Sequence, residues 1–286
     1  MNEIKTIGII GAGTMGSGIA SVSALNGFKT ILYDIKDELV QTGISKIAKG
    51  WSKLVEKGKM TTDKLKTIND NIVSTTKLES FKDCDIIIEA AVENLEIKKS
   101  LFKEFESICS DDCIFATNTS SFSITAIASS IKNKERVVGM HFFNPANIMK
   151  LIEIIHGEFT SQEVINTAIE FSKKLGKVPV VCKDTPAFIV NRVARSFYGE
   201  ALKILSEEEI DVKTIDTIIK EEGGFKMGPF ELMDLIGIDV NYSVTCSVYE
   251  AFFHDQKYKP SQIQRKMVEA GLLGRKTAQG FYKYDN

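Results

Sequence analysis

The chain has 286 residues, of which 43% are hydrophobic and 26% are charged, and its formal net charge is −2. This length predicts about two domains, and the hydrophobic fraction excludes a largely disordered chain. The weak charge excludes general affinity for nucleic acid or anionic lipid, and no apolar run approaches the roughly 20 residues of a membrane span. The N-terminus lacks a signal-peptide pattern, and the five scattered cysteines indicate a reduced, cytoplasmic protein without a metal site.

The first strong pattern is a strand–turn–helix–strand unit over residues 4–34. An apolar run over residues 4–10 leads into the turn GAGTMG at residues 11–16. A helix is predicted over residues 17–25 and a second strand over residues 30–33, which ends at Asp34. A glycine turn alone is a weak signal, but here the elements on both sides of it agree with a dinucleotide-binding unit.

Each glycine of this turn has a distinct physical purpose. Gly11 permits the sharp turn, Gly13 leaves room for a pyrophosphate, and Gly16 lets the helix lie close to the strand. The N-terminus of the helix attracts phosphate, and Asp34 can accept hydrogen bonds from ribose hydroxyls. The acid repels a 2′-phosphate and therefore favours NAD, while Lys36 beside it keeps NADP as the less favoured alternative.

The remaining elements divide the chain in two. Strands are predicted over residues 71–75, 85–91, 113–117, 137–142, 149–155 and 178–182, and helices over residues 35–57, 95–110, from about 124, and 161–175. After Pro186 only helices are predicted, over residues 187–205, 211–221, 229–253 and 260–270, followed by a short tail. We therefore predict an α/β fold, in which residues 1–185 form a Rossmann-type doubly wound sheet and residues 186–286 an all-α domain.

Polar residues follow two of the predicted strands. Glu93 and Lys98 come after the strand over residues 85–91, and Asn118-Thr119-Ser120-Ser121 comes after the strand over residues 113–117. Ligands of open parallel sheets bind at the carboxyl ends of strands, so these side chains are candidates for the site. Ordinary helix starts, with an N-cap and a solvated lysine, would explain part of the pattern equally well.

His141 and Glu153 lie at equal distances from Asn147, so an antiparallel return of the chain would set them side by side. A single histidine in an apolar strand is more often a core residue than a catalyst. A glutamate inside the run LIEII needs a partner, however, and His141 is the obvious candidate.

Two other groups of residues have weaker signals. Lys53, Lys57 and Lys59 surround a helix end, where lysines are favoured anyway, although a phosphorylated ligand would also explain them. Asn191 has poor helix propensity and lies just past the domain boundary, so it either faces a cleft or is simply exposed.

The ordered set of motifs resembles the L-3-hydroxyacyl-CoA dehydrogenase family over the whole chain, most closely its short bacterial 3-hydroxybutyryl-CoA dehydrogenases. These motifs are GAGTMG, EAAVEN, TNTSS, GMHFFNP, KLIEII, TPAFIVNR, MGPFEL and GRKTAQGFYKY, which begin at residues 11, 89, 117, 139, 150, 185, 227 and 274. The resemblance implies an NAD-dependent, monofunctional oxidoreductase that acts on acetoacetyl-CoA or 3-hydroxybutyryl-CoA, and a homodimer formed through the C-terminal domain.

The resemblance also implies residue roles. His141 matches the catalytic base, Glu153 its carboxylate partner, and Ser120 and Asn191 the groups that hold the substrate's oxygens. Ser52 and Lys59 match the contacts with CoA. The cofactor-binding positions are Gly11, Gly13, Thr14, Met15, Gly16, Asp34, Glu93, Lys98, Asn118 and Asn144.

Two departures and two alternatives remain. Asn147 replaces a second proline that many relatives carry, and Ala187 stands where glycine is common. Activity is expected to survive both. The alternatives are a dehydrogenase of a free hydroxy acid or sugar acid on the same fold, and a dinucleotide-binding protein without turnover; the presence of all four catalytic positions argues against the second.

Overall fold

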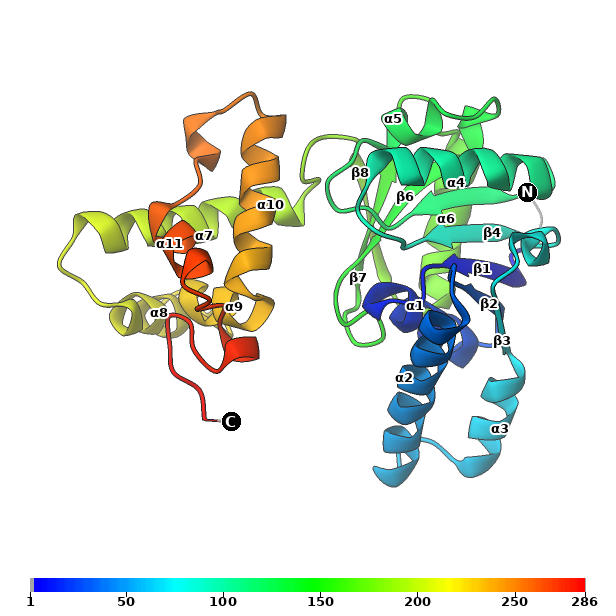
Figure 1. Cartoon of the computed structure of the whole chain (residues 1–286), viewed down its shortest axis with the longest axis horizontal. Helices are drawn as coiled ribbons and strands as arrows, with labels where there is room; N and C mark the ends of the chain where they lie inside the picture. The colour runs from blue at the N-terminus through cyan, green and yellow to red at the C-terminus, as the bar shows by residue number, and fades with distance from the viewer. Residues whose placement is uncertain (1–2, 286) are drawn as a thin grey trace. The chain divides into compact units, whose positions relative to one another are not determined.

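The structure is a computed structural model that describes residues 3–285; residues 1–2 and 286, the outer ends of the two predicted domains, lie outside the described residues. Contacts divide the chain into two compact units, Met1–Thr185 and Pro186–Asn286 (Figure 1). The predicted doubly wound α/β sheet and the all-helical C-terminal part are both confirmed. None of the helices in residues 3–285 is long and apolar enough to cross a membrane.

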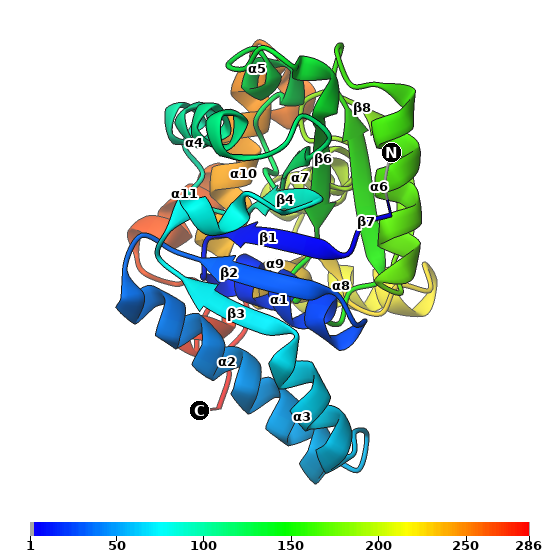
Figure 2. The same cartoon turned by 90° about the vertical axis from the view of Figure 1, so that its right-hand side faces the viewer.

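The first unit is built on one eight-stranded sheet in the order β3-β2-β1-β4-β5-β6-β7-β8. Its strands are β1 (Thr6–Ile10), β2 (Lys29–Tyr33), β3 (Ile72–Thr75), β4 (Ile86–Glu89), β5 (Ile114–Thr117), β6 (Val137–Phe142), β7 (Leu151–His156) and β8 (Val178–Lys183). The pairs are parallel except for β6 with β7, which are antiparallel. Figure 2 shows β3, β2, β1 and β4 in this order. The chain adds β2 and β3 on one side of β1 and then crosses to the other side to add β4, so the strand order reverses between β1 and β4. This switch point is where open sheets bind ligands.

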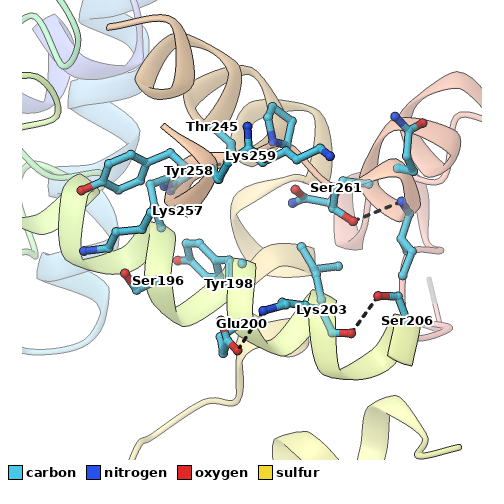
Figure 3. A pocket seen from close by; sticks show the side chains of 18 residues that line it. Ser196, Tyr198, Glu200, Lys203, Ser206, Thr245, Lys257, Tyr258, Lys259 and Ser261 are labelled. Carbon is cyan, nitrogen blue, oxygen red and sulfur yellow. Dashed lines mark hydrogen bonds and ion pairs between the residues drawn. The ribbon is translucent and has the colours of Figure 1, made fainter. Parts of the chain in front are cut away.

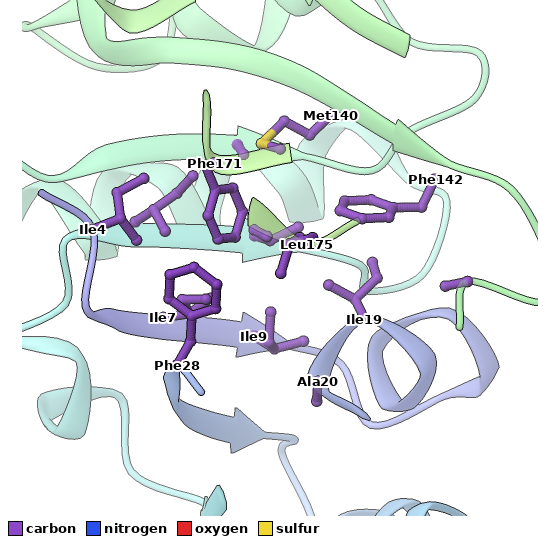
Figure 4. Close-up of a cluster of buried hydrophobic side chains, with 14 of the residues drawn as sticks. Ile4, Ile7, Ile9, Ile19, Ala20, Phe28, Met140, Phe142, Phe171 and Leu175 are labelled. Carbon is purple, nitrogen blue, oxygen red and sulfur yellow. The ribbon is translucent and has the colours of Figure 1, made fainter. Parts of the chain in front are cut away.

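Helices cover both faces of this sheet because its central strands are apolar on both sides. They are α1 (Thr14–Leu25), α2 (Asp37–Glu56), α3 (Thr62–Asp70), α4 (Leu95–Ile108), α5 (Ile124–Ala128) and α6 (Gln162–Lys174). One core joins β1 and β6 to α1 and α6, and in Figure 4 the rings of Phe28 and Phe171 meet there, edge to face at 5.3 Å. On α4, Phe102 and Phe105 pack edge-on or tilted around Phe115 of β5.

The helix α3 was not among the predicted elements. Its sequence is polar, and Ile68 is its one buried residue, so its apolar pattern is too short to stand out. Thr61 begins it by accepting a hydrogen bond from the backbone N of Lys64 at 3.2 Å.

The second unit is helical: α7 (Val190–Glu207), α8 (Val212–Glu221), α9 (Pro229–Ile236), α10 (Ile238–Ala251) and α11 (Gln262–Glu269). Its main core contains Tyr198, Leu202, Phe230, Met233 and Ile238.

Two predicted boundaries in this unit were wrong. The single helix expected over residues 229–253 is divided, because Gly237 has a φ of 102° and ends α9 before α10 begins. The first long helix begins at Val190 rather than at Ala187, since Ala187 and Phe188 have φ values of 64° and 50°. Ala187 thus occupies a conformation that favours glycine, which agrees with the expectation of a glycine at this position.

Candidate active site

His141 and Glu153 form a close pair on neighbouring strands. In the antiparallel pairing of β6 with β7 they are direct partners, and His141 Nδ1 lies 2.7 Å from Glu153 Oε2. The expected juxtaposition is therefore confirmed. His141 is 6% exposed and Glu153 is 1% exposed. A buried carboxylate that accepts a hydrogen bond from Nδ1–H orients the imidazole and selects the tautomer in which Nε2 carries the lone pair.

The loop that joins these two strands is fastened by a buried lysine. Lys177 is 7% exposed, and its Nζ donates to the backbone oxygens of Ala146 at 2.5 Å and Met149 at 2.8 Å. Burial lowers the pKa of Lys177. These bonds hold the loop on both sides of Asn147. Asn144, a predicted cofactor contact, is exposed in the same loop.

The loop after β5 is tied to the strand that carries His141. Asn118 Oδ1 accepts from the backbone N of Phe142 at 2.9 Å, and the backbone N of Asn118 donates to Glu89 O at 2.7 Å. Ser120 follows two residues later, with its backbone N 3.2 Å from Glu93 Oε1. The side-chain carbonyl of Asn118 thus already accepts a hydrogen bond within the protein. The hydroxyl of Ser120, in contrast, makes no hydrogen bond to any described residue.

Glu93 is the acceptor that organises this loop. Its Oε1 accepts from Thr119 Oγ1 at 2.6 Å and Ser121 Oγ at 2.9 Å, and its Oε2 lies 3.1 Å from Lys98 Nζ. Burial opposes the ionisation of Glu93, but Lys98 and the two hydroxyls outweigh it, and the pKa of Glu93 is lowered.

Glu89 was missed by the sequence reasoning and is the hub of the same network. It is fully buried at the end of β4, and it accepts from Lys98 Nζ at 2.8 and 3.0 Å, from Thr117 Oγ1 at 2.7 Å and from the backbone N of Ala91 at 2.8 Å. The signal was available, since an acid in the run DIIIEAA needs partners for the same reason as Glu153 in LIEII.

The glycine turn has the shape that a dinucleotide requires. Gly11 has a φ of 95°, and a Cβ on Gly16 would lie 1.7 Å from Gly11 O, so helix and turn are in direct contact. A Cβ on Gly13 would meet no atom of the described chain within 4 Å. Among residues 3–285 no side chain caps α1, and its first turn holds no acid, so its N–H groups remain available to an anion. Thr14 begins this helix, and Met15 packs against the core.

Asp34 is fixed at the end of β2. Its Oδ2 accepts from the backbone N of Ala12 and its Oδ1 from the backbone N of Ile35, both at 2.8 Å. A carboxylate offers about four acceptor sites, so ribose hydroxyls can still donate to Asp34. The geometry and charge of the turn therefore fit NAD.

Three further predicted site residues lie on helix α2, after its end, and on α7. Ser52 is exposed on α2, and Lys59 is exposed after its end. Asn191 is on the first turn of α7 in the second unit, and its side chain is partly buried. No three His, Cys, Asp or Glu side chains of the described residues are grouped as a metal would require.

Two family models match the chain. The model of the 3-hydroxyacyl-CoA dehydrogenase NAD binding domain matches residues 6–185, and that of the C-terminal domain matches residues 188–284. The chain belongs to the 3-hydroxyacyl-CoA dehydrogenase family. The resemblance is thereby confirmed, and the chain is an oxidoreductase of this family.

Relatives of the chain in this family are known from several organisms. It is 44% identical to the 3-hydroxyadipyl-CoA dehydrogenase of Escherichia coli over 99% of its own length, but spans 60% of that protein. It is 42% identical to a 3-hydroxybutyryl-CoA dehydrogenase of Clostridioides difficile, and 98% of this chain and 99% of that protein are covered. A solved (S)-3-hydroxybutyryl-CoA dehydrogenase from Ralstonia eutropha has a TM-score of 0.95 and 39% identity, covering 99% of this chain and 100% of that one.

Proposed function

We propose that this protein is a 3-hydroxybutyryl-CoA dehydrogenase, which transfers a hydride reversibly between NAD(H) and C3 of a short-chain 3-hydroxyacyl-CoA or 3-ketoacyl-CoA. The observation that carries the proposal is the buried pair His141–Glu153, joined at 2.7 Å, in the same sheet as the strand that leads into a dinucleotide-type turn. The relatives with this activity in their names support the choice of substrate.

The roles follow from the chemistry of a secondary alcohol. Its oxidation requires a base for the O–H proton, and an imidazole accepts a proton readily near neutral pH. Glu153 orients His141 and stabilises the imidazolium that forms. In the reverse direction, His141 as imidazolium gives its proton to the oxygen at C3. Ser120, whose hydroxyl has no partner in the described chain, would hydrogen-bond that oxygen. The resemblance gives Asn191 the role of a second group that holds the substrate's oxygens.

Asp34 and the glycine turn would hold the cofactor, with Thr14, Met15, Glu93, Lys98, Asn118 and Asn144 around it. When bound, NAD supplies the hydride acceptor for C3. The carboxylate of Asp34 argues for NAD rather than NADP, because a 2′-phosphate would meet its charge. Within the described residues, Glu93 accepts from the backbone N of Ser120, and Lys98 forms an ion pair with Glu93.

The remaining parts of the proposal rest on the resemblance or, for the cytoplasm, on the scattered cysteines and the N-terminal sequence. They are CoA contacts at Ser52 and Lys59, a homodimer formed through residues 186–286, and action in the cytoplasm. The competing function is oxidation of a free hydroxy acid or sugar acid, which would use the same base without a CoA-binding surface.

The deciding experiment is an absorbance assay of NADH consumption. Acetoacetyl-CoA and free acetoacetate are compared as substrates, and NADPH is run in parallel. Turnover with NADH and acetoacetyl-CoA alone supports the proposal, and turnover with NADPH alone would overturn the role given to Asp34. Turnover with free acetoacetate but none with its CoA ester would establish the competing function.

A further inference from the structure

The second unit contains a cavity of about 1040 Å³ between α7 and the segment that leads into α11 (Figure 3). All of its lining residues belong to residues 195–264, so the cavity lies within this unit. Its volume is of the size that holds a small molecule, which is on the order of 300–1,000 Å³. The glycine turn and His141 are not among its lining residues.

The lining of the cavity is strongly positive in a chain whose net charge is −2. It includes Arg195, Lys203, Lys257 and Lys259, and Glu200 is the one carboxylate among the lining residues. Glu200 lies 3.9 Å from Lys203 at exposed positions, where an ion pair contributes little. Exposed lysines are common on protein surfaces, so the decisive residue is the buried cation.

Arg195 is a buried cation without a counter-ion. It is 4% exposed, and its Nη1 donates to Asn241 O at 2.9 Å and to Thr245 Oγ1 at 2.7 Å, while its Nε donates to Asn191 O at 3.2 Å. All three acceptors are uncharged, and Arg195 forms no ion pair with any carboxylate of residues 3–285. Burial lowers the pKa of its guanidinium to about 10. The guanidinium also lies over the ring of Tyr198, 5.0 Å from its centroid. These neutral groups supply no counter-ion, so an anion in the cavity would lower the free-energy cost of burying the charge.

The surroundings of Arg195 are ordered by a further polar network. The side chain of Asn241 accepts from Gln264 Nε2 at 2.9 Å, and Gln264 lines the cavity from the first turn of α11. Ser261, the N-cap of α11, also lines it and accepts from the backbone N of Ile263 at 3.1 Å, so the other N–H groups of this first turn are the ones left for a ligand. The cavity therefore has the N-terminal end of an eight-residue helix on one side and a buried guanidinium on the other. Both favour an anion.

We propose that this cavity binds a phosphate ester of about nucleotide size, with the phosphate between Arg195 and the N-terminus of α11. A phosphate group carries about −1.5 to −2 charges at pH 7, so it matches the lining better than a single carboxylate does. Lys257 and Lys259 would meet further phosphate oxygens at the rim. The site is independent of the proposed oxidoreductase function.

The test is calorimetric titration of guanosine 5′-diphosphate into the full chain saturated with NADH, since nucleotide phosphates could otherwise enter the glycine turn. Guanosine is the uncharged comparison, and inorganic phosphate is the smallest probe. We expect the diphosphate to bind with a Kd below about 1 mM, at least tenfold more tightly than guanosine. Equal affinity for guanosine, or no binding of the diphosphate, would overturn the proposal.

Variants locate the binding. The double variant Lys257→Ser/Lys259→Ser removes two exposed cations, of which Lys257 lies over the ring of Tyr258 at 5.4 Å from its centroid. It should weaken diphosphate binding at least tenfold. Lys213→Ser on α8, outside the cavity, should leave it unchanged, as should Lys59→Ser in the first unit. Arg195→Lys should also weaken it in a protein whose circular dichroism is normal. Unchanged affinity in the double variant, or loss in Lys59→Ser, would show that the ligand binds elsewhere. If the double variant keeps its affinity for the diphosphate but loses self-association, the cavity is instead an interface between copies of the chain.

Discussion

The carboxylate of Glu153 matters for His141 in two ways. It limits the rotation of the His141 ring, which lies on β6 opposite Glu153 of the antiparallel neighbour β7. It also provides the negative charge that stabilises an imidazolium at this buried position. His141 also lies against the ring of Phe143, 4.6 Å between centroids, which further restricts it.

We predict that His141→Gln lowers kcat with acetoacetyl-CoA by on the order of 10²- to 10⁴-fold while NADH binding and the melting temperature change little. The base is lost, but a polar side chain of similar size remains. His156→Gln, on β7 but outside the pair, is the matched control and should retain its kcat. Near-normal turnover of His141→Gln would remove His141 from the mechanism. Steady-state kinetics and NADH fluorescence titration are the measurements.

The lowered pKa of Glu93 predicts a pH-dependent stability. The folded-state pKa lies below that of an unfolded glutamate, about 4.3, so ionised Glu93 stabilises the folded protein above this pH. The contribution is lost as the pH falls through the lower, folded-state pKa. Glu93→Gln should therefore reduce the free energy of unfolding at pH 7, and the difference from the unaltered protein should shrink in acid. Urea unfolding at several pH values measures it, and a difference that grows in acid would contradict the assignment. Glu96→Gln, an exposed neighbour on α4, is the control.

At the scale of elements, the turn between β1 and α1 contains glycines that are needed for two different reasons. Gly16 is required by the protein, because any side chain there would collide with Gly11 O. Gly13 faces open space, so the protein alone gives no reason for the absence of a side chain. The reason that remains is a ligand which approaches the backbone at Gly13.

Gly13→Ala is therefore predicted to fold normally but to bind NADH at least tenfold more weakly, as measured by fluorescence titration. Gly50→Ala is the control, since its added Cβ also meets no described atom within 4 Å, and it lies inside α2. That variant should keep its NADH affinity and gain roughly 0.5–1 kcal/mol of stability. Equal NADH affinity of Gly13→Ala and the unaltered protein would place the pyrophosphate elsewhere.

At the scale of the whole molecule, buried carboxylates in each unit accept hydrogen bonds from residues that are distant in the sequence. In the second unit, Asp234 is 1% exposed and accepts from the backbone N of Phe281 at 3.0 Å, from the backbone N of Tyr282 at 2.9 Å and from Tyr284 Oη at 2.9 Å. Asp216, equally buried, accepts from Tyr282 Oη at 2.8 Å. The C-terminal tail is thus part of the core rather than an appendage.

Deletion of residues 281–286 should destabilise the protein by about 3–5 kcal/mol, because it leaves buried charges without their donors. Deletion of residues 285–286 keeps these donors and should cost little. Chemical denaturation followed by circular dichroism compares the two truncations. Similar unfolding midpoints would mean that the aspartates find other partners.

Periodicity, glycine spacing and single acids in apolar runs were enough to predict all eight strands, most of the helices, the glycine turn and the His141–Glu153 pair. These features are local, or they link segments through the regular register of two adjacent strands. The Glu89–Lys98–Glu93 network, the break at Gly237, the anchoring of the tail and the buried Arg195 were decided only by the tertiary structure. They depend on which distant side chains meet and how much water each one loses, and neither quantity is encoded in spacing along the chain.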